Sequence, residues 1–243
     1  MNIALIGYGK MGRTIERLAL AEGHEIVLKI DADNAQNWSA AQLATTDVAI
    51  EFSRPDAAYT NIMTCLKAGV PVVSGTTAWL DRYPEVVEWC TANGGACFFA
   101  SNFSIGVNIF FELNRHLARL MNAQQGYRVE LEEIHHTQKL DAPSGTAVTL
   151  AEGLLEQLQH LERYELQAAR PAQVAHNVVP IYAERVGDTP GTHVVAYHAT
   201  IDSLEIKHTA HGREGFASGA LMAAKWLQNK TGVFGMSDLL RLK

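Results

Sequence analysis

The feature that most constrains the fold is a glycine-rich hexapeptide near the start of the chain. It reads Gly7-Tyr8-Gly9-Lys10-Met11-Gly12, follows a short apolar run at 3–6, and leads into apolar residues at helical spacing. A G-x-G-x-x-G between a strand and a helix is the context in which this motif binds a dinucleotide. Gly7 permits the tight turn, Gly9 admits a pyrophosphate to the backbone N–H groups, and Gly12 lets the helix pack on the strand. We therefore predict that these six residues contact a dinucleotide, with a ligand-free glycine turn as the alternative.

Further short apolar segments extend this pattern over the first part of the chain. They lie at 26–30, 48–52, 71–74 and 96–100, and they alternate with helical patterns, one of which has Asp56 as its expected N-cap and runs to Leu66. Strands that alternate with helices predict a parallel sheet covered on both faces. We expect a Rossmann-like α/β domain over residues 1–102, joined by residues 214–243, which include an alanine-rich amphipathic helix at 215–227.

The pattern changes after residue 102. A helical stretch at 105–121 leads to a strand-like run at 128–134 and a helix at 146–158, and two strand-like runs at 192–200 and 203–210 resemble a hairpin. This layout predicts a second, α+β domain with a mixed sheet over residues 103–213.

Composition excludes several classes of protein. The chain has 243 residues and a formal net charge of -6 without a basic run, which disfavours nucleic acid and anionic membranes as partners. It shows no signal segment and no apolar stretch of roughly 18 residues, so we expect a soluble cytoplasmic protein. Its cysteines, Cys65, Cys90 and Cys97, have no C-x-x-C spacing, which indicates neither a disulfide framework nor a zinc ribbon. A small molecule is the expected partner.

Other residues at strand ends are candidates for holding the cofactor. Asp31 follows the second apolar run, about 20 residues beyond the glycine loop, where a carboxylate accepts hydrogen bonds from the adenosine ribose. A carboxylate there repels the 2′-phosphate of NADPH and Ala32 offers no compensating arginine, so NADH is the preferred guess over NADPH; Asp33 is a weaker candidate for the ribose. Two later loops carry small hydroxyl and amide groups that suit a nicotinamide ribose and carboxamide, although each is equally compatible with a simple turn: Gly75-Thr76-Thr77 and Ala100-Ser101-Asn102-Phe103.

The densest polar cluster of the sequence lies at 132–146. His135, His136 and Lys139 there can form a cationic pocket that binds carboxylates and supplies a proton near neutral pH. Gly145 and Thr146 open the next predicted helix, whose first N–H groups can hold an anion. The cluster predicts a site for a diacid; a solvated polar loop that caps a helix is the alternative.

Metal binding is not expected at this cluster. Adjacent residues of an extended segment point to opposite sides, so His135 and His136 cannot both face one ion. A catalytic zinc needs about three protein ligands, and neither H-E-x-x-H nor C-x-x-C is present.

At these residues the sequence resembles the 4-hydroxy-tetrahydrodipicolinate reductase family, also called dihydrodipicolinate reductase, of lysine and diaminopimelate biosynthesis. The family segment E-x-H-H-x-x-K-x-D-A-P-S-G-T-A stands here at residues 133–147. The segments 75–77, 100–104, 185–193 and 213–220 are also similar to that family, so the resemblance covers almost the whole chain.

The resemblance implies roles for single residues. His135 and Lys139 become the proton-donor pair, with the direct donor left open and Lys139 preferred, while His136, Gly145 and Thr146 hold the carboxylates of a cyclic dicarboxylate substrate. A nicotinamide then delivers a hydride to that substrate, and water is lost. The resemblance further implies a homotetramer built through the sheet of the second domain, which therefore binds both substrate and subunits.

Two other functions remain open from the residues alone. A semialdehyde or sugar dehydrogenase can share a two-domain scaffold, but the acylating semialdehyde enzymes need a cysteine nucleophile. A nucleotide-binding sensor would use the first domain without catalysis, which the cluster of histidine and lysine disfavours.

Overall fold

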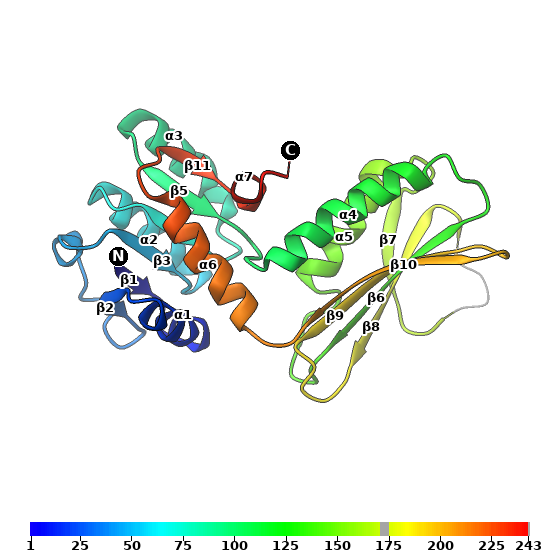
Figure 1. Ribbon diagram of the computed structural model, residues 1–243, viewed down its shortest axis with the longest axis horizontal. Helices are drawn as coiled ribbons and strands as arrows, with labels where there is room; N and C mark the ends of the chain where they lie inside the picture. Colours follow the sequence, from blue (N-terminus) through cyan, green and yellow to red (C-terminus); the bar gives the residue numbers. More distant parts are fainter. Residues whose placement is uncertain (171–174, 243) are drawn as a thin grey trace. The chain divides into compact units, whose positions relative to one another are not determined.

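The computed structural model describes residues 1–170 and 175–242. These residues form two compact units, one of Met1–Ile105 with Arg213–Lys243 and the other of Gly106–Gly212 (Figure 1). The first unit is therefore built from both ends of the chain, and the second is inserted between them.

The first unit contains a six-stranded sheet of order β11-β5-β4-β3-β1-β2 in which all pairs are parallel. This confirms the predicted Rossmann-like domain. Because β2 and β3 lie on opposite sides of β1, the chain reverses direction across the sheet at β1, and such a point is where ligands of open α/β sheets bind. The strands are β1 (Asn2–Ile6), β2 (Glu25–Ile30), β3 (Val48–Glu51), β4 (Val72–Ser74), β5 (Ala96–Phe99) and β11 (Gly232–Phe234).

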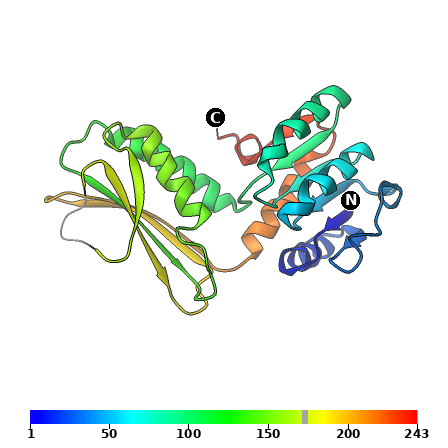
Figure 2. The same ribbon diagram turned by 180° about the vertical axis from the view of Figure 1, so that it is seen from behind.

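Helices cover both faces of this sheet (Figures 1 and 2). On β1, Ile3 and Leu5 face the core under α1 and α6, whereas the alternate residues Ala4 and Ile6 face the core under α2 and α3. This two-sided burial explains why the strands read as continuous apolar runs. The helices are α1 (Lys10–Ala21), α2 (Pro55–Lys67), α3 (Tyr83–Asn93), α6 (Glu214–Leu227) and the short α7 (Met236–Leu240), with 3₁₀ turns at Ala40–Leu43 and Leu80–Arg82.

The expected N-cap of α2 is wrong by two positions. The helix begins at Pro55 with Arg54 as its N-cap, and Asp56 lies in its first turn, where it pairs with the Arg54 guanidinium. Proline is favoured at the first helical position because its ring fixes φ and its missing N–H is not needed there. Asp56 instead places its carboxylate near the positive end of the helix.

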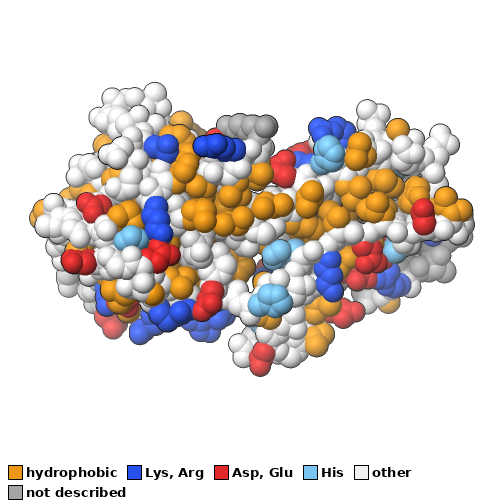
Figure 3. All heavy atoms as spheres, viewed as in Figure 1, with side chains coloured by type: hydrophobic (Ala, Val, Ile, Leu, Met, Phe, Trp, Pro, Cys, Tyr) orange, Lys and Arg blue, Asp and Glu red, His pale blue; other side chains and the backbone are white. Residues whose placement is uncertain are grey.

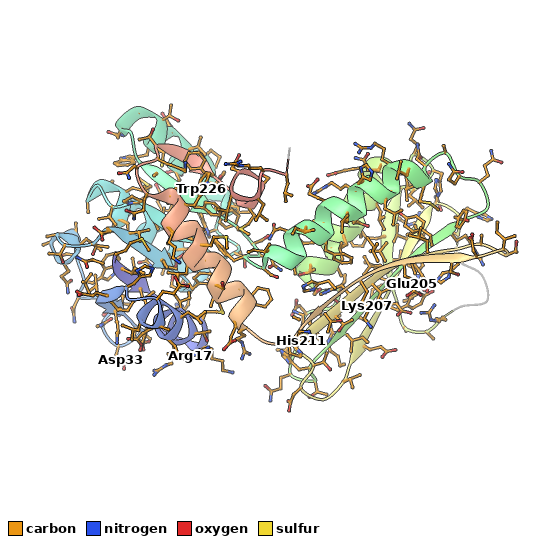
Figure 4. All side chains as sticks on the ribbon, in the orientation of Figure 1. Arg17, Asp33, Glu205, Lys207, His211 and Trp226 are labelled. Atoms are coloured by element: carbon orange, nitrogen blue, oxygen red, sulfur yellow. The ribbon has the colours of Figure 1, made fainter. Side chains whose placement is uncertain are left out.

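The second unit contains a five-stranded mixed sheet of order β10-β9-β6-β8-β7, as the sequence predicts. The helices α4 (Ile105–Met121) and α5 (Gly145–Gln157) pack on one face over a core that includes Leu131, Ile181 and Val195. The other face carries no described helix and presents charged groups such as Glu205 and Lys207 of β10 (Figure 4). The strands are β6 (Arg128–His135), β7 (Arg163–Gln167), β8 (Val178–Arg185), β9 (Gly191–His198) and β10 (Ser203–Ala210).

Exposed apolar side chains gather along α4 (Figure 3). Ile109, Leu113 and Leu120 are 42%, 52% and 56% exposed and recur at helical spacing, while Phe110 and Ala118 of the same helix are buried in the core. Among the described residues, no helix combines the length and the apolar character that a membrane span requires.

Gly219 of α6 is a position where packing overrides helix propensity. A Cβ at Gly219 would lie 1.8 Å from the Phe103 carbonyl oxygen, whereas a Cβ at Gly215 of the same helix would lie 3.9 Å from the Ser104 Oγ. We predict that Gly219→Ala lowers the free energy of unfolding by about 2 kcal/mol or more through overpacking. The control Gly215→Ala should be neutral or stabilise by up to about 1 kcal/mol. Urea unfolding of both variants checks this, and equal stabilisation would contradict the close packing of α6.

Candidate active site

The glycine loop of the first unit leaves one of its glycines open. A Cβ at Gly7, which has a φ of +97°, would lie 2.0 Å from the Phe52 carbonyl oxygen, and a Cβ at Gly12 would lie 2.3 Å from the Gly7 carbonyl oxygen. A Cβ at Gly9 would meet no described atom within 4 Å, and Gly9 is the N-cap of α1. Two glycines are thus required by the protein's own packing, and the third leaves the helix N-terminus accessible, which fits a pyrophosphate.

The loops that follow β3 and β4 are tied together by a buried carboxylate that the sequence analysis missed. Glu51 is fully buried and accepts hydrogen bonds from the Ser53 N–H (3.0 Å) and hydroxyl, the Ser74 hydroxyl (2.7 Å) and the Thr76 hydroxyl (3.0 Å). The Thr76 oxygen also accepts from the Ser53 N–H at 2.9 Å. The Thr76 side chain therefore organises this edge of the sheet through Glu51.

Phenylalanine rings fix the neighbouring candidate positions. A Cβ at Gly75 would lie 2.2 Å from the Phe52 ring, which is why this position needs glycine. The Phe103 ring is buried, with its centroid 5.6 Å from that of Phe52 and 5.9 Å from that of Phe98. Phe103 therefore contributes its side chain to the core. The other candidates divide into the exposed Lys10, Thr77 and Ser101, the half-buried Met11 and Asn102, and the buried Ala100.

Asp31 lies directly after β2, half-buried, and its Oδ1 accepts from the Ala32 N–H at 2.6 Å. Nearby, the Tyr8 hydroxyl donates to Glu16, which is paired with Lys29 at 2.5 Å. The Lys29 ammonium lies 5.0 Å from the centroid of the Tyr8 ring. These contacts fix the Tyr8 side chain beside the glycine loop and place a cation on the strand that leads to Asp31.

In the second unit, the structure brings His135 together with Glu133 and His193 rather than with His136. Glu133 and His135 are alternate, buried residues of β6, and His193 is buried on the adjacent strand β9. The Glu133 Oε2 lies 3.6 Å from the His135 Nδ1 and 3.6 Å from the His193 Nε2. The two imidazole rings meet edge to face, with centroids 5.0 Å apart. His136 follows the strand and is only half-buried.

Ser144 connects this cluster to the start of α5. Its backbone N–H donates to both oxygens of Glu133, at 3.2 and 3.0 Å, and its hydroxyl lies 3.1 Å from the His193 Nε2. The same hydroxyl caps the helix by accepting from the Ala147 N–H. Gly145 and Thr146 form the first turn of α5, where N–H groups have no intrahelical acceptor. This arrangement fixes the N-terminus of α5 beside Glu133 and His193.

Lys139 is held in the same region by an ion pair with Asp141. Its ammonium lies 2.8 Å from each carboxylate oxygen of Asp141. Arg185 of β8 holds the loop between β6 and α5 in place. Its guanidinium donates to the Lys139 carbonyl at 3.3 Å, the Asp141 carbonyl at 2.6 Å and the Glu133 carboxylate at 3.1 Å. Two cations and an imidazole therefore lie close to one helix N-terminus.

The surroundings shift the pKa values of Glu133 and His135. Burial raises the pKa of Glu133, but the adjacent His193 imidazole and the hydrogen bonds from Ser144 and Arg185 outweigh it and lower the pKa to about 2. Burial lowers the pKa of His135 to about 4, helped by His193, Lys139 and Arg185 and opposed by Glu133. Glu133 is thus a carboxylate at neutral pH, and the imidazole of His135 is neutral before any ligand binds.

Glu133, His135 and His193 also place three potential metal ligands within 4.8 Å of one another. From the sequence, only the adjacent residues His135 and His136 were considered as metal ligands, and the grouping with Glu133 and His193 was not predicted. Arg185 and the Ser144 N–H already donate to Glu133, which disfavours a cation at this carboxylate. The carboxylate of Glu133 already has these hydrogen-bond donors without an ion.

The cysteines are unsuited to nucleophilic catalysis. Cys65, Cys90 and Cys97 are all buried and free. Burial raises the pKa of the Cys90 thiol to about 11 and raises the pKa values of Cys65 and Cys97 as well. Because the thiolate is the nucleophile, these surroundings disfavour an acylating semialdehyde dehydrogenase.

The alternation of β6 carried a signal that the sequence analysis did not use. Val129 and Leu131 face the core, so Glu133 and His135, at the next alternate positions, also face inward. A carboxylate at a core-facing position needs hydrogen-bond partners. The alternation therefore pointed to Glu133, but nothing in the sequence identified Arg185 and His193 as its partners.

A parallel sheet with a glycine loop and a mixed-sheet unit with clustered histidine and lysine define an NAD(P)H-dependent oxidoreductase. The comparisons with known proteins identify its family. The model for the N-terminus of dihydrodipicolinate reductase matches residues 1–103, and the model for its C-terminus matches residues 106–240. The chain belongs to the dihydrodipicolinate reductase family, which confirms the resemblance found in the sequence.

Individual relatives agree with this placement. The chain is 51% identical to a 4-hydroxy-tetrahydrodipicolinate reductase of Christiangramia forsetii over 99% of this chain and 98% of the relative. It is 34% identical to a 4-hydroxy-tetrahydrodipicolinate reductase of Nitrosomonas eutropha over 100% of this chain and 99% of the relative. Among solved structures, the dipicolinate-bound dihydrodipicolinate reductase of Paenisporosarcina sp. TG-14 has the same fold, with a TM-score of 0.75 and 22% identity over 98% of this chain and 99% of that one.

The lowered pKa of His135 predicts a dependence of stability on pH. Its folded-state pKa of about 4 lies below the ordinary 6.5, so the unfolded chain takes up this proton first as the pH falls. This contribution to stability is complete above about pH 6.5 and is lost as the pH falls toward about 4. We predict that His135→Gln flattens the fall of the urea midpoint between pH 6.5 and 4.5. An unchanged slope would show that His135 titrates normally.

Proposed function

We propose that this chain reduces 4-hydroxy-tetrahydrodipicolinate to tetrahydrodipicolinate with NADH or NADPH, in the biosynthesis of lysine and diaminopimelate. The reaction adds a hydride and a proton to the substrate and releases one water. The observation that carries the proposal is the grouping of His135 and Lys139 beside the N-terminus of α5, in a chain that both family models match.

The second unit offers complementary charge for a cyclic dicarboxylate. In the proposal, Gly145 and Thr146 hold one carboxylate at the start of α5, and His136 contacts the substrate alongside them. Lys139 now pairs with Asp141, and a substrate carboxylate competes with Asp141 for the ammonium. Because both carboxylates of the substrate are anionic, the cationic side chains and the N-terminus of α5 supply most of the binding energy.

The first unit supplies the cofactor site. The loop Gly7 to Gly12 holds the pyrophosphate at the start of α1, and Asp31 accepts hydrogen bonds from the adenosine ribose. The loops at Gly75 to Thr77 and Ala100 to Phe103 complete the proposed site at the carboxyl edge of the sheet. When bound, the nicotinamide supplies the hydride.

Proton donation is assigned to His135 and Lys139. Lys139 is exposed by 21% of its side chain and carries three N–H donors, whereas the side chain of His135 is 9% exposed. A cation near the reacting ring also stabilises the negative charge that the hydride brings. We assign the direct transfer to Lys139 and a supporting role at the substrate to His135, because the Lys139 side chain is the more exposed of the two.

The setting of the reaction is proposed from the sequence. We infer a cytoplasmic enzyme without nucleic-acid or membrane partners, which works as a homotetramer. We propose that the subunits assemble through the sheet face opposite α4 and α5, which no described helix covers.

A coupled assay tests the proposed reaction. The substrate is generated in place from pyruvate and aspartate semialdehyde by its synthase, and oxidation of NADH or NADPH is followed by absorbance. Oxidation that depends on the synthase supports the reductase. Measurable NADH binding without oxidation of either cofactor would instead support the nucleotide-binding sensor.

Lys139→Ala tests the proton donor. We predict that kcat falls by about 100-fold or more, the contribution of a positioned general acid. The dissociation constant for NADH should change by less than about threefold, because the variant leaves the first unit intact. Lys67→Ala, in an exposed lysine of α2, is the matched control and should keep the activity. Turnover of Lys139→Ala at the wild-type rate would remove Lys139 from the chemistry.

Asp31 is the proposed determinant of cofactor preference. We predict a higher kcat/KM with NADH than with NADPH, and Asp31→Asn should raise the value for NADPH by about tenfold, as expected when about 1.4 kcal/mol of repulsion is lost. Glu25→Gln is the control, because Glu25 is exposed at the opposite end of β2 from Asp31. A clear wild-type preference for NADPH would contradict the repulsion argument.

A further inference from the structure

The His135 imidazole has two nitrogens in different surroundings, and the difference bears on its proposed role at the substrate. Its Nδ1 is buried and has no hydrogen-bond partner among the described residues. Its Nε2 lies 3.1 Å from the position that a Cβ on Gly191 would occupy. One nitrogen therefore lies buried in the protein interior, and the other lies so close to Gly191 that a side chain at that position would crowd it.

The inner nitrogen faces a carboxylate that cannot move away. The Glu133 Oε2 lies 3.6 Å from the His135 Nδ1, and Glu133 is anchored by Arg185 and by the Ser144 N–H. A hydrogen bond between these atoms requires an approach of only about 0.5 Å. Since a carboxylate accepts but does not donate, its presence favours a proton on Nδ1.

His193 contacts both Glu133 and Ser144 and also packs on the His135 ring. Its Nε2 lies 3.6 Å from the Glu133 Oε2 and 3.1 Å from the Ser144 Oγ, which caps α5. Its ring also packs edge to face on the His135 ring. His193 thus fixes the plane of the His135 imidazole and couples it to the start of the helix that receives the substrate carboxylate.

We propose that Glu133 and His193 are positioning residues that hold the His135 imidazole with its proton on Nδ1 and its Nε2 on the side of Gly191, away from Glu133. This inference rests on the proposed function, in which His135 acts at the substrate. A neutral Nδ1–H imidazole presents a basic Nε2, which accepts a hydrogen bond or a proton from the ligand side. The carboxylate behind it then stabilises the imidazolium that forms, as in other carboxylate–histidine pairs.

The charges around His135 add a second consequence. Burial opposes the imidazolium most strongly, and His193 on β9, Lys139 in the following loop and Arg185 on β8 oppose it as well, whereas Glu133 on β6 favours it. A bound dicarboxylate adds negative charge beside these groups, which favours the imidazolium. Binding of a dicarboxylate is therefore accompanied by uptake of a proton at His135.

Nitrogen NMR of the histidine-labelled wild-type protein tests both statements without any substitution. The His135 resonance is assigned by its loss in His135→Gln, and pyridine-2,6-dicarboxylate serves as the ligand. We expect the Nδ1–H tautomer in the free protein, and a rise in the pKa of His135 by at least about one unit on binding. A dominant Nε2–H tautomer, or a pKa that the ligand leaves unchanged, would overturn the proposal.

Substitutions separate positioning from a general structural role. Glu133→Gln should lower kcat by about 10- to 100-fold, a part of what a positioned acid–base group contributes. The KM for the dicarboxylate should change less than about threefold, and the acid limb of the kcat profile should move. Glu152→Gln, an exposed residue of α5, makes the same charge change as a control. NADH binding and thermal melting report whether each variant folds; if Glu133→Gln does not fold, the wild-type tautomer decides.

Substitutions in β9 change the residues that lie against the same imidazole. His193→Gln keeps a polar atom near the position of Nε2 and should retain more activity than His193→Leu, and loss of equal size in both would contradict a positioning role. Gly191→Ala should lower kcat by crowding the His135 Nε2. If the wild-type protein binds NADH and the dicarboxylate but reduces nothing, the proposed reaction fails, whereas the tautomer measurement still decides the inference.

Discussion

The second unit depends on one buried carboxylate at the carboxyl end of a central strand. Glu133 is fully buried, and its carboxylate accepts hydrogen bonds from the Arg185 guanidinium and the Ser144 N–H. The imidazoles of His135 and His193 each lie 3.6 Å from its Oε2. An unpaired charge at this depth would cost several kcal/mol, so the partners are a condition for the fold and not an addition to it. Through them Glu133 fixes the loop of Lys139, the start of α5 and the ring of His135 together.

The first unit also contains a buried glutamate at the carboxyl end of a strand. Glu51 is the last residue of β3 and accepts hydrogen bonds from the hydroxyl groups of Ser53, Ser74 and Thr76. Backbone glycines then bring the loops close, as the approach of Gly7 to the Phe52 carbonyl shows. In both units, therefore, a buried glutamate and its donors shape the edge of the sheet where the candidate site lies.

The sequence predicted most of the fold because its strongest signals are local. The strand at 3–6 with its glycine loop and the helix at 105–121 follow from apolar spacing, and both are observed. The strands at Arg163–Gln167, Val178–Arg185 and Gly232–Phe234 were missed, since each depends on pairing with residues elsewhere in the chain. At the candidate site, His135 and Lys139 were recognised from one segment. Their partners Arg185 and His193 lie about 50 residues further along, and only sheet pairing brings them together.

The central claim is that the cluster around His135 and Lys139 supports hydride transfer from a nicotinamide to a cyclic dicarboxylate. The most direct measurement supplies the enzyme with NADH carrying deuterium at the transferable position, together with the synthase-generated substrate in ordinary water. We expect one deuterium on a ring carbon of the tetrahydrodipicolinate formed, and a second new hydrogen that comes from the solvent. Product without deuterium from either face of the labelled nicotinamide would contradict it.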